Sequence, residues 1–434
     1  MIRTYTRWLS LLLLSSLLAC SSVDKEEPQP SITDTVWSNS AYGYCPQLMT
    51  RSTLEESVTV LPARAMHKTG KIYLWGRYIF INELYEGLHI IDNQDPSHPK
   101  ALGFLRIPGN VDLAIQNNYL YVDNGPDLVT LDVSNVQAPR ITSRVRNAFR
   151  ELLPPMGYVD QACATTRPEN TVVVGWQYVN IPPPATSTTS PGWGWWDRAV
   201  LFNSAGAPSS AAAPGNLTGK SGSLARFTIL NQMLYTVDNQ SLHLFDLRTP
   251  SSPVAGAKVE LAFGVETIFP HDHYLFLGTQ RGMYIFDAAT PQAPRQVAYY
   301  QHIVSCDPVV VDGNYAYVTL RNGRFCGGGP NQLQVIDLTN LDQPRLAQTY
   351  PMTGPQGLGV DNGQLFVCDS DGLKTFSTQQ APQLTLQEHF QVKVTDVIPH
   401  AGILLAIGED GLYQYRYTGT KLEQLSLLPI TPLP

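Results

Sequence analysis

A short phrase recurs along this chain of 434 residues, and its recurrence limits the possible folds more than any other feature. Each copy is an apolar run that ends in aspartate, with a proline seven residues after the aspartate. Five copies are complete: GLHIIDNQDPSHP (87–99), DLVTLDVSNVQAP (127–139), SLHLFDLRTPSSP (241–253), GMYIFDAATPQAP (282–294) and QLQVIDLTNLDQP (332–344). Most copies lie about 40 residues apart, and a period of that length predicts a repeat architecture.

Each repeat unit contains four short extended segments, which in the second unit are 111–116, 118–123, 127–133 and 139–145. Four strands in about 40 residues predict one blade of a β-propeller. Two degenerate copies follow, with Ser377 and Arg416 in place of the aspartate, and the 114-residue gap after the second copy has room for one more unit with a long insertion. We therefore expect an all-β protein, a β-propeller of eight four-stranded blades, with seven blades as the alternative.

The phrase itself has a structural interpretation. It corresponds to the third strand of a blade and the loop into the fourth. The aspartate can accept backbone N–H groups within that loop, as in an Asx-turn. The proline opens the outermost strand, where a missing N–H donor costs little.

The apolar–Asp phrase (HIID, VTLD and VIDL here) resembles the LVIVD-repeat family, which are predicted β-propellers of bacterial and archaeal cell surfaces. Segments 78–115 and 305–320 are particularly similar to the Bacteroidota lipoproteins of that family. The resemblance covers about residues 45–417. It implies the propeller fold and a location at the cell surface, and it implies little about activity.

The first 19 residues predict an export signal. Arg3 and Arg7 precede the apolar run Leu9–Leu18, which is half the length needed to span a bilayer as a helix. The sequence Leu17-Leu18-Ala19-Cys20 resembles a bacterial lipobox, which implies cleavage before Cys20 and a diacylglyceryl thioether on its sulfur. An ordinary signal peptide, or a buried apolar helix, is the alternative.

Residues 20–40 predict a flexible tether, because they are polar, contain proline and lack periodicity. No aspartate directly follows Cys20, which favours an outer-membrane lipoprotein. The cluster Asp24-Lys25-Glu26-Glu27 resembles the surface-export signal of Bacteroidota lipoproteins, so we expect display at the cell surface. An inward-facing outer-membrane lipoprotein is the next alternative.

The charge of the chain bears on its partners. The net charge is −7, and it becomes −9 without residues 1–19. No basic stripe is present to neutralise phosphates, so we expect no nucleic-acid partner. The expected partners are the membrane, through the lipid anchor, and an envelope protein or glycan, with the chain itself a monomer.

These features divide the chain into four parts: a signal peptide (1–19), a lipidated tether (20–40), an N-terminal segment that packs on the propeller (41–63), and the propeller itself (64–430) with an insertion at 180–222.

Several acidic residues fall near the start of the first strand of a unit, which lines the central channel of a propeller. They are Asp112, Asp160, Glu266, Asp307 and Asp396, and Arg226 takes the corresponding place in another unit. If these positions are equivalent, the carboxylates converge at one mouth of the channel. They could then bind a cationic ligand or Ca²⁺, the one cofactor that we consider. In the alternative, each carboxylate caps its own turn between blades.

Two further groups of residues are candidates for structure or binding. Cys306 and Cys326 flank a predicted hairpin and can form a disulfide, Cys45 with Cys163 is a guess, and Cys368 is expected to be a buried free thiol. The insertion carries Trp193, Trp195 and Trp196, which could bind a partner or glycan or could equally seal the ring. His271-Asp272-His273 resembles a metal-ligand pair but falls on a predicted hairpin tip.

No catalytic motif such as G-x-S-x-G, a P-loop or H-E-x-x-H is present. The leading hypothesis is therefore a non-enzymatic propeller scaffold of the outer membrane. The alternative is an envelope carbohydrate-active hydrolase or lyase that uses the acids at the propeller funnel as acid and base.

Overall fold

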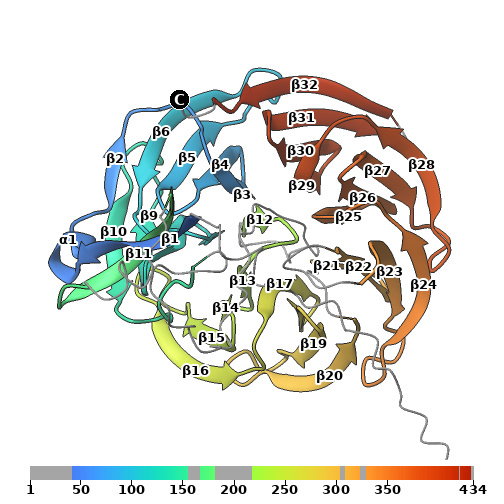
Figure 1. Ribbon diagram of the computed structural model, residues 1–434, viewed down its shortest axis with the longest axis horizontal. Helices are drawn as coiled ribbons and strands as arrows, with labels where there is room; N and C mark the ends of the chain where they lie inside the picture. Colours follow the sequence, from blue (N-terminus) through green and yellow to red (C-terminus); the bar gives the residue numbers. More distant parts are fainter. Residues whose placement is uncertain are drawn as a thin grey trace, which may run out of the picture.

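Seven blades arranged in a ring form the protein in the computed structural model (Figure 1), which describes residues 42–154, 167–180, 218–303, 308–322, 329–419 and 421–431. Each blade contains four consecutive antiparallel strands, and the first strand faces the centre of the ring. Blade 1 consists of β3 (Thr69–Trp75), β4 (Tyr78–Glu83), β5 (Gly87–Asp92) and β6 (Lys100–Arg106). Blade 2 consists of β7 (Leu113–Gln116), β8 (Tyr119–Asn124), β9 (Asp127–Asp132) and β10 (Arg140–Val145).

The other five blades repeat this pattern. Blade 3 consists of β13 (Phe227–Leu230), β14 (Met233–Asp238), β15 (Ser241–Asp246) and β16 (Val254–Glu260), and blade 4 of β17 (Val265–His271), β18 (Tyr274–Thr279), β19 (Gly282–Asp287) and β20 (Arg295–Gln301). Blade 5 consists of β21 (Val309–Asp312), β22 (Tyr315–Leu320), β23 (Gln332–Asp337) and β24 (Arg345–Pro351), and blade 6 of β25 (Leu358–Asp361), β26 (Gln364–Asp369), β27 (Gly372–Ser377) and β28 (Thr385–Phe390). Blade 7 consists of β29 (Val394–His400), β30 (Ile403–Gly408), β31 (Gly411–Thr418) and β32 (Lys421–Pro429).

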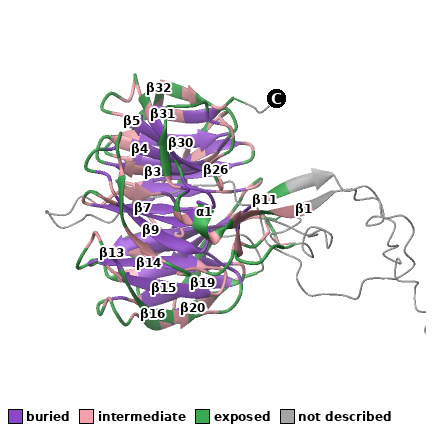
Figure 2. Cartoon of the chain, turned by 90° about the vertical axis from the view of Figure 1, so that its left-hand side faces the viewer, coloured by how far each residue is buried: buried purple, intermediate pink, exposed green. Residues whose placement is uncertain are grey.

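Two short strands extend blade 1 on opposite sides. On the outside, β2 (Thr59–Leu61) pairs with β6, and on the inside β12 (Lys220–Ser221) pairs with β3. The strands β1 (Tyr42–Thr50) and β11 (Thr171–Asn180) form a separate two-stranded sheet, and helix α1 (Arg51–Glu55) follows β1. This two-stranded sheet projects from one face of the disc (Figure 2).

The propeller prediction is confirmed, but the preferred count of eight blades is wrong and the alternative of seven is correct. An eighth blade was expected in the gap between the second and third complete copies of the phrase. The described strands in that gap pair elsewhere, β11 with β1 and β12 with β3, so they do not form a blade of their own.

The interpretation of the phrase as a strand and an Asx-turn is confirmed. In every complete copy the aspartate Oδ1 accepts the backbone N–H two residues later, at 2.8–3.0 Å, and these residues are Asp92, Asp132, Asp246, Asp287 and Asp337. The proline directly precedes the outermost strand, which carries an irregularity in its pairing with the third strand in every blade. Such irregularities discourage pairing with other chains.

Apolar side chains between neighbouring blades hold the ring together. The strands near the centre are buried and the outer strands are largely exposed (Figure 2). Between blades 7 and 1, Ile398 and Leu405 share one core with Ile79 and Ile91. Because every core contains side chains from two or three blades, removal of one blade would expose the apolar faces of both neighbours.

Polar contacts complete the junction where the two ends of the ring meet. Residue 66 forms a parallel bridge with Ile430. The amides of Asn93 and Gln414 bond each other reciprocally, at 2.9 and 2.7 Å, and Ser426 Oγ donates to the Pro96 carbonyl at 2.7 Å. The ring therefore closes by contacts between complete blades rather than by a blade that mixes strands from both ends.

Candidate functional site

The central channel holds a segment of the chain itself, residues 218–226, which we call the channel segment. Figure 1 shows β12, part of this segment, near the middle of the ring. The segment runs antiparallel to β3, and the Gly219 N–H donates to the Ile115 carbonyl of blade 2 at 2.9 Å. Farther along, the Ala225 carbonyl accepts the Ile268 N–H of blade 4 at 2.8 Å, and Ser223 Oγ accepts the Leu358 N–H of blade 6 at 3.1 Å. These contacts alone join the channel segment to four different blades.

The passage of the segment through the channel depends on a glycine. A Cβ atom on Gly219 would lie 2.1 Å from Cε1 of Tyr73, so a larger residue cannot occupy this position without movement. Tyr73 is itself buried between blades 1 and 2, where its hydroxyl accepts the Ile115 N–H at 2.9 Å. Residues 222–225 of the segment are buried. The segment is thus part of the packed interior.

An ion pair lies beside the channel segment. Lys71 Nζ on β3 is 2.6 Å from Asp112 Oδ2, and both side chains are almost fully buried. The same oxygen of Asp112 accepts the backbone N–H groups of Arg226 and Phe227 at the start of β13. Asp112 therefore joins blades 1, 2 and 3. Burial lowers the pKa of Lys71, and the Asp112 carboxylate opposes that change.

A second buried aspartate, Asp123, lies next to Asp112 and is not among the residues predicted from the sequence. Its Oδ1 accepts Asn110 Nδ2 at 2.7 Å and the N–H groups of Val111 and Asp112 at 2.8 and 3.1 Å. Burial raises the pKa of Asp123 to about 7, although these hydrogen bonds act in the opposite direction. All three donors bond to Oδ1.

Asp396 lies on the inner strand of blade 7 and is completely buried. Its two carboxylate oxygens have no hydrogen-bonding partner of normal geometry among the described residues, although Lys71 and Ser223 lie nearby. Burial raises the pKa of Asp396 well above its usual value. Such an environment favours a neutral carboxyl group.

The other candidates from the sequence are spread over different parts of the ring. Glu266 accepts Gln280 Nε2 at 3.0 Å within blade 4, and the Arg226 guanidinium donates to Asn239 at 2.7 Å within blade 3. Asp112 and Asp396 are the two predicted acids that share the neighbourhood of Lys71. His271 and His273 face different aspartates, Asp272 and Asp287, at 3.8 and 3.9 Å.

Some predicted residues lie outside the described part of the chain. They are Cys20, Asp160, Trp193, Trp195, Trp196, Asp307, Cys306 and Cys326. Cys45 is in a disulfide, and Cys163, its guessed partner, is also outside the described residues. Cys368 is confirmed as a buried free thiol.

Within the described ranges, no three His, Cys, Asp or Glu side chains are placed to hold a metal ion. The same part of the chain contains no helix that is long and apolar enough to cross a membrane. The arrangement in the channel is instead one of ion pairs and hydrogen bonds between blades and the channel segment.

Comparisons with known proteins agree with this architecture. A family model described as the LVIVD repeat matches residues 68–104, 109–146 and 305–351, which confirms the resemblance of the repeated phrase. No curated protein matches the chain.

Two solved structures illustrate the likeness in fold. The periplasmic gluconolactonase of Pseudomonas aeruginosa is 14% identical, with a TM-score of 0.53 over 83% of this chain and 96% of that chain. A protein from Lactobacillus plantarum is 12% identical, with a TM-score of 0.50 over 78% of this chain and 89% of that chain. At these identities the likeness concerns the fold alone.

Proposed function

We propose that this protein, a β-propeller that carries LVIVD repeats, is a non-enzymatic binding scaffold of the cell envelope. In this proposal a lipid on Cys20 holds the chain in the outer membrane, and the propeller is displayed at the cell surface. Its partner is an envelope protein or a glycan, bound through the outer surfaces of the ring.

The observation that carries the non-enzymatic part is the filled channel. The channel segment occupies the place where side chains from different blades converge, and the Lys71–Asp112 pair is already engaged by blades 1, 2 and 3. A general acid or base must reach a proton of the substrate, directly or through one water. Buried groups that bond their own chain do not offer that access.

The lipobox at Leu17–Cys20 and the acidic cluster at Asp24–Glu27 support the location. Radiolabelled palmitate tests the anchor: we expect the wild-type chain to be labelled and the Cys20→Ser chain to be unlabelled and released from membranes. Labelling of the Cys20→Ser chain would contradict the proposal.

Surface display is tested separately, by protease treatment of intact cells. We expect the wild-type chain to be degraded and a variant with Lys25, Glu26 and Glu27 replaced by alanine to be protected. Both chains should be labelled equally by palmitate, so that the comparison reports on export alone. Equal protection of both chains would show that the protein faces inward.

The enzymatic alternative makes a different prediction. An envelope hydrolase or lyase that uses the channel acids should release sugars from envelope polysaccharides, and Glu266→Gln with Asp396→Asn should abolish that release. We expect no release by wild type above that of buffer. Turnover that the double variant loses, with unchanged circular dichroism, would replace the scaffold by an enzyme.

A further inference from the structure

The outer edge of blade 1 already carries an added strand. β2 pairs antiparallel with β6 at three positions: Thr59 faces Arg106, Val60 faces Leu105 and Leu61 faces Phe104. β2 comes from the segment before the propeller, so it is an addition to a complete four-stranded blade. The outer strand of a blade in this protein can therefore accept an extended segment despite the irregularity in its pairing with the third strand.

The same place on blade 2 carries no added strand among the residues that the structure describes. Arg144 and Val145 of β10 face Val129 and Leu128 of β9, just as Phe104 and Leu105 of β6 face His89 and Leu88 of β5. The two sets of pairs differ by a constant 40 residues, so residues 144–146 correspond to the residues of β6 that bind β2. Among the described strands, β10 pairs with β9 alone.

A groove lies along this open edge. Residues 143–146 line it together with residues 252–255 of blade 3 and Glu55 of α1, and its volume is about 750 Å³. A second hollow of about 490 Å³, which includes Arg51 and Asn170, shares Glu55 and Arg146 with the first. The edge thus faces a trough with walls from blade 3 and α1.

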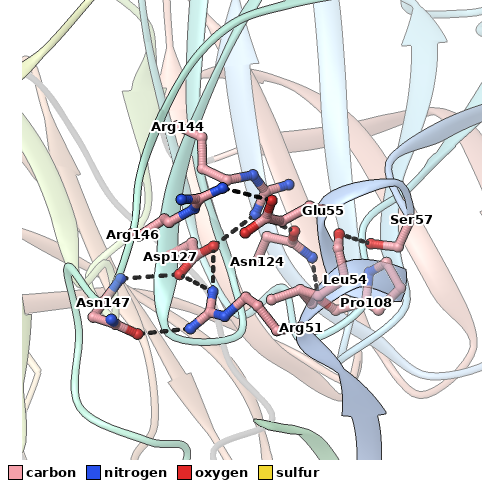
Figure 3. Close-up of polar contacts among 10 residues, drawn as sticks. All are labelled: Arg51, Leu54, Glu55, Ser57, Pro108, Asn124, Asp127, Arg144, Arg146 and Asn147. Atoms are coloured by element: carbon pink, nitrogen blue, oxygen red, sulfur yellow. Dashed lines mark hydrogen bonds and ion pairs between the residues drawn. The ribbon is translucent and has the colours of Figure 1, made fainter. Parts of the chain in front are cut away.

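The trough is basic. Arg51 Nη1 lies 2.6 and 2.7 Å from the two oxygens of Asp127, and Arg144 Nη1 lies 2.8 Å from one of them (Figure 3). Arg146 pairs with Glu55 at 2.8 Å, and its side chain is 65% exposed. Three arginines thus face two carboxylates. Arg144 Nη2 is buried and has no hydrogen-bonding partner among the described residues.

The corresponding places on blades 3 and 5 are less suited to an acidic strand. On β16, Lys258 and Glu260 pair with each other at 2.8 Å, and β24 ends at Pro351, which has no N–H to donate. On β10 the backbone edge, the trough and the excess positive charge coincide.

We propose that the edge of β10 at residues 144–146 binds an extended acidic segment of a partner polypeptide as an added antiparallel strand. Main-chain hydrogen bonds would give affinity, as in other β-augmentation complexes, and the exposed side chain of Arg146 would select acidic side chains. This inference rests on the proposed binding function and names the chemistry of the partner and the surface that it contacts.

The test uses the full chain with Cys20→Ser and a fluorescent peptide of alternating glutamate and valine, followed by anisotropy. We expect saturable binding, and binding weaker by about tenfold or more for Arg146→Glu or for a lysine–valine peptide. Arg295→Glu on β20 is the matched control, because Arg295 is exposed on another outer strand. It should bind as wild type does.

A peptide with the same side chains but N-methylated amides separates strand addition from simple charge attraction. We expect it to lose binding, and we expect hydrogen exchange at residues 143–146 to slow only with the unmodified peptide. No binding at all, or binding that survives both N-methylation and Arg146→Glu, would overturn the inference. A partner captured at the cell surface equally well by Arg146→Glu would also overturn it, while leaving the scaffold proposal in place.

Discussion

Two sets of aspartates in this protein have the same side chain and opposite surroundings. The rim set consists of the five aspartates that end the third strands: Asp92, Asp132, Asp246, Asp287 and Asp337. The channel set consists of Asp112, Asp123 and Asp396, which are buried around Lys71. Rim aspartates bond a backbone N–H two residues away. Asp112, in contrast, accepts hydrogen bonds from residues of blades 1 and 3.

Some members of the two sets have pKa values that are shifted in opposite directions. Hydrogen bonds from Ser134 lower the pKa of Asp132, and hydrogen bonds from Thr339 lower that of Asp337. Burial raises the pKa of Asp123 and Asp396. Local hydrogen bonds thus stabilise the charged form of Asp132 and Asp337, whereas burial near the axis favours the neutral form of Asp123 and Asp396.

The largest effect is expected for Lys71→Met, which leaves Asp112 buried without its counter-ion. Breaking a buried pair by removing one partner costs about 3–5 kcal/mol in the free energy of unfolding. Urea unfolding measures this loss. Lys100→Met on the exposed start of β6 is the control and should change stability by less than about 0.5 kcal/mol. A loss of less than about 1 kcal/mol in the free energy of unfolding of Lys71→Met would contradict the claim that the channel set depends on its partners from other blades.

The second effect is a dependence of stability on pH that Asp123 controls. The folded chain keeps the Asp123 proton up to about pH 7, whereas the unfolded chain releases it near pH 3.9. The folded state therefore binds one more proton between these values. The free energy of unfolding should fall as pH rises through this window, by up to about 1.4 kcal/mol per pH unit.

Urea unfolding of wild type and Asp123→Asn across pH 4 to 8 tests this dependence, since the other titrating groups are common to both chains. We expect the variant to lose the Asp123 contribution to the slope. Asp132 at the rim acts with the opposite sign: because its pKa is lowered, its contribution is present above about pH 4 and is lost below it. Identical slopes for the two chains would contradict the assignment of the proton.

A smaller effect is expected at the rim. Asp132→Ala removes one Asx-turn hydrogen bond of 2.8 Å to the Ser134 N–H, and such a bond contributes about 1 kcal/mol. Asp132→Asn should cost less, because asparagine can make the same turn. Thermal unfolding of both variants measures the difference. Equal losses would mean that the charge matters more than the hydrogen bond.

The smallest effect is a gain. In the sixth copy of the phrase Ser377 replaces the aspartate, and its hydroxyl meets the Gln379 N–H at 3.4 Å. Ser377→Asp should restore the shorter bond and raise the free energy of unfolding by about 0.5 kcal/mol. Ser370→Asp, in a different turn, is the comparison and should bring no gain. A loss of stability in Ser377→Asp would show that the sixth turn differs in backbone shape.

The parts of this structure that sequence could predict are those whose partners are near in the chain. The segment 127–133 was expected as a strand and β9 spans Asp127–Asp132, because its pattern and its turn are both local. The blade count depended on β11 and β12, whose partners β1 and β3 are more than a hundred residues away. Neither Asp123 nor the trough beside β10 was predicted, for the same reason. The charge of Asp123 depends on burial, and the trough exists only where α1, blade 2 and blade 3 meet.

The channel segment also constrains the order in which the ring can form. Residues 218–226 precede blades 3 to 7 in the chain and follow blades 1 and 2. Blades 3 to 7 follow the segment in the chain, and its hydrogen bonds to Ile268 of blade 4 and Leu358 of blade 6 can form only once those blades have folded. The centre of the ring is therefore completed only when blade 6 is in place, although the segment that fills it is made before blade 3.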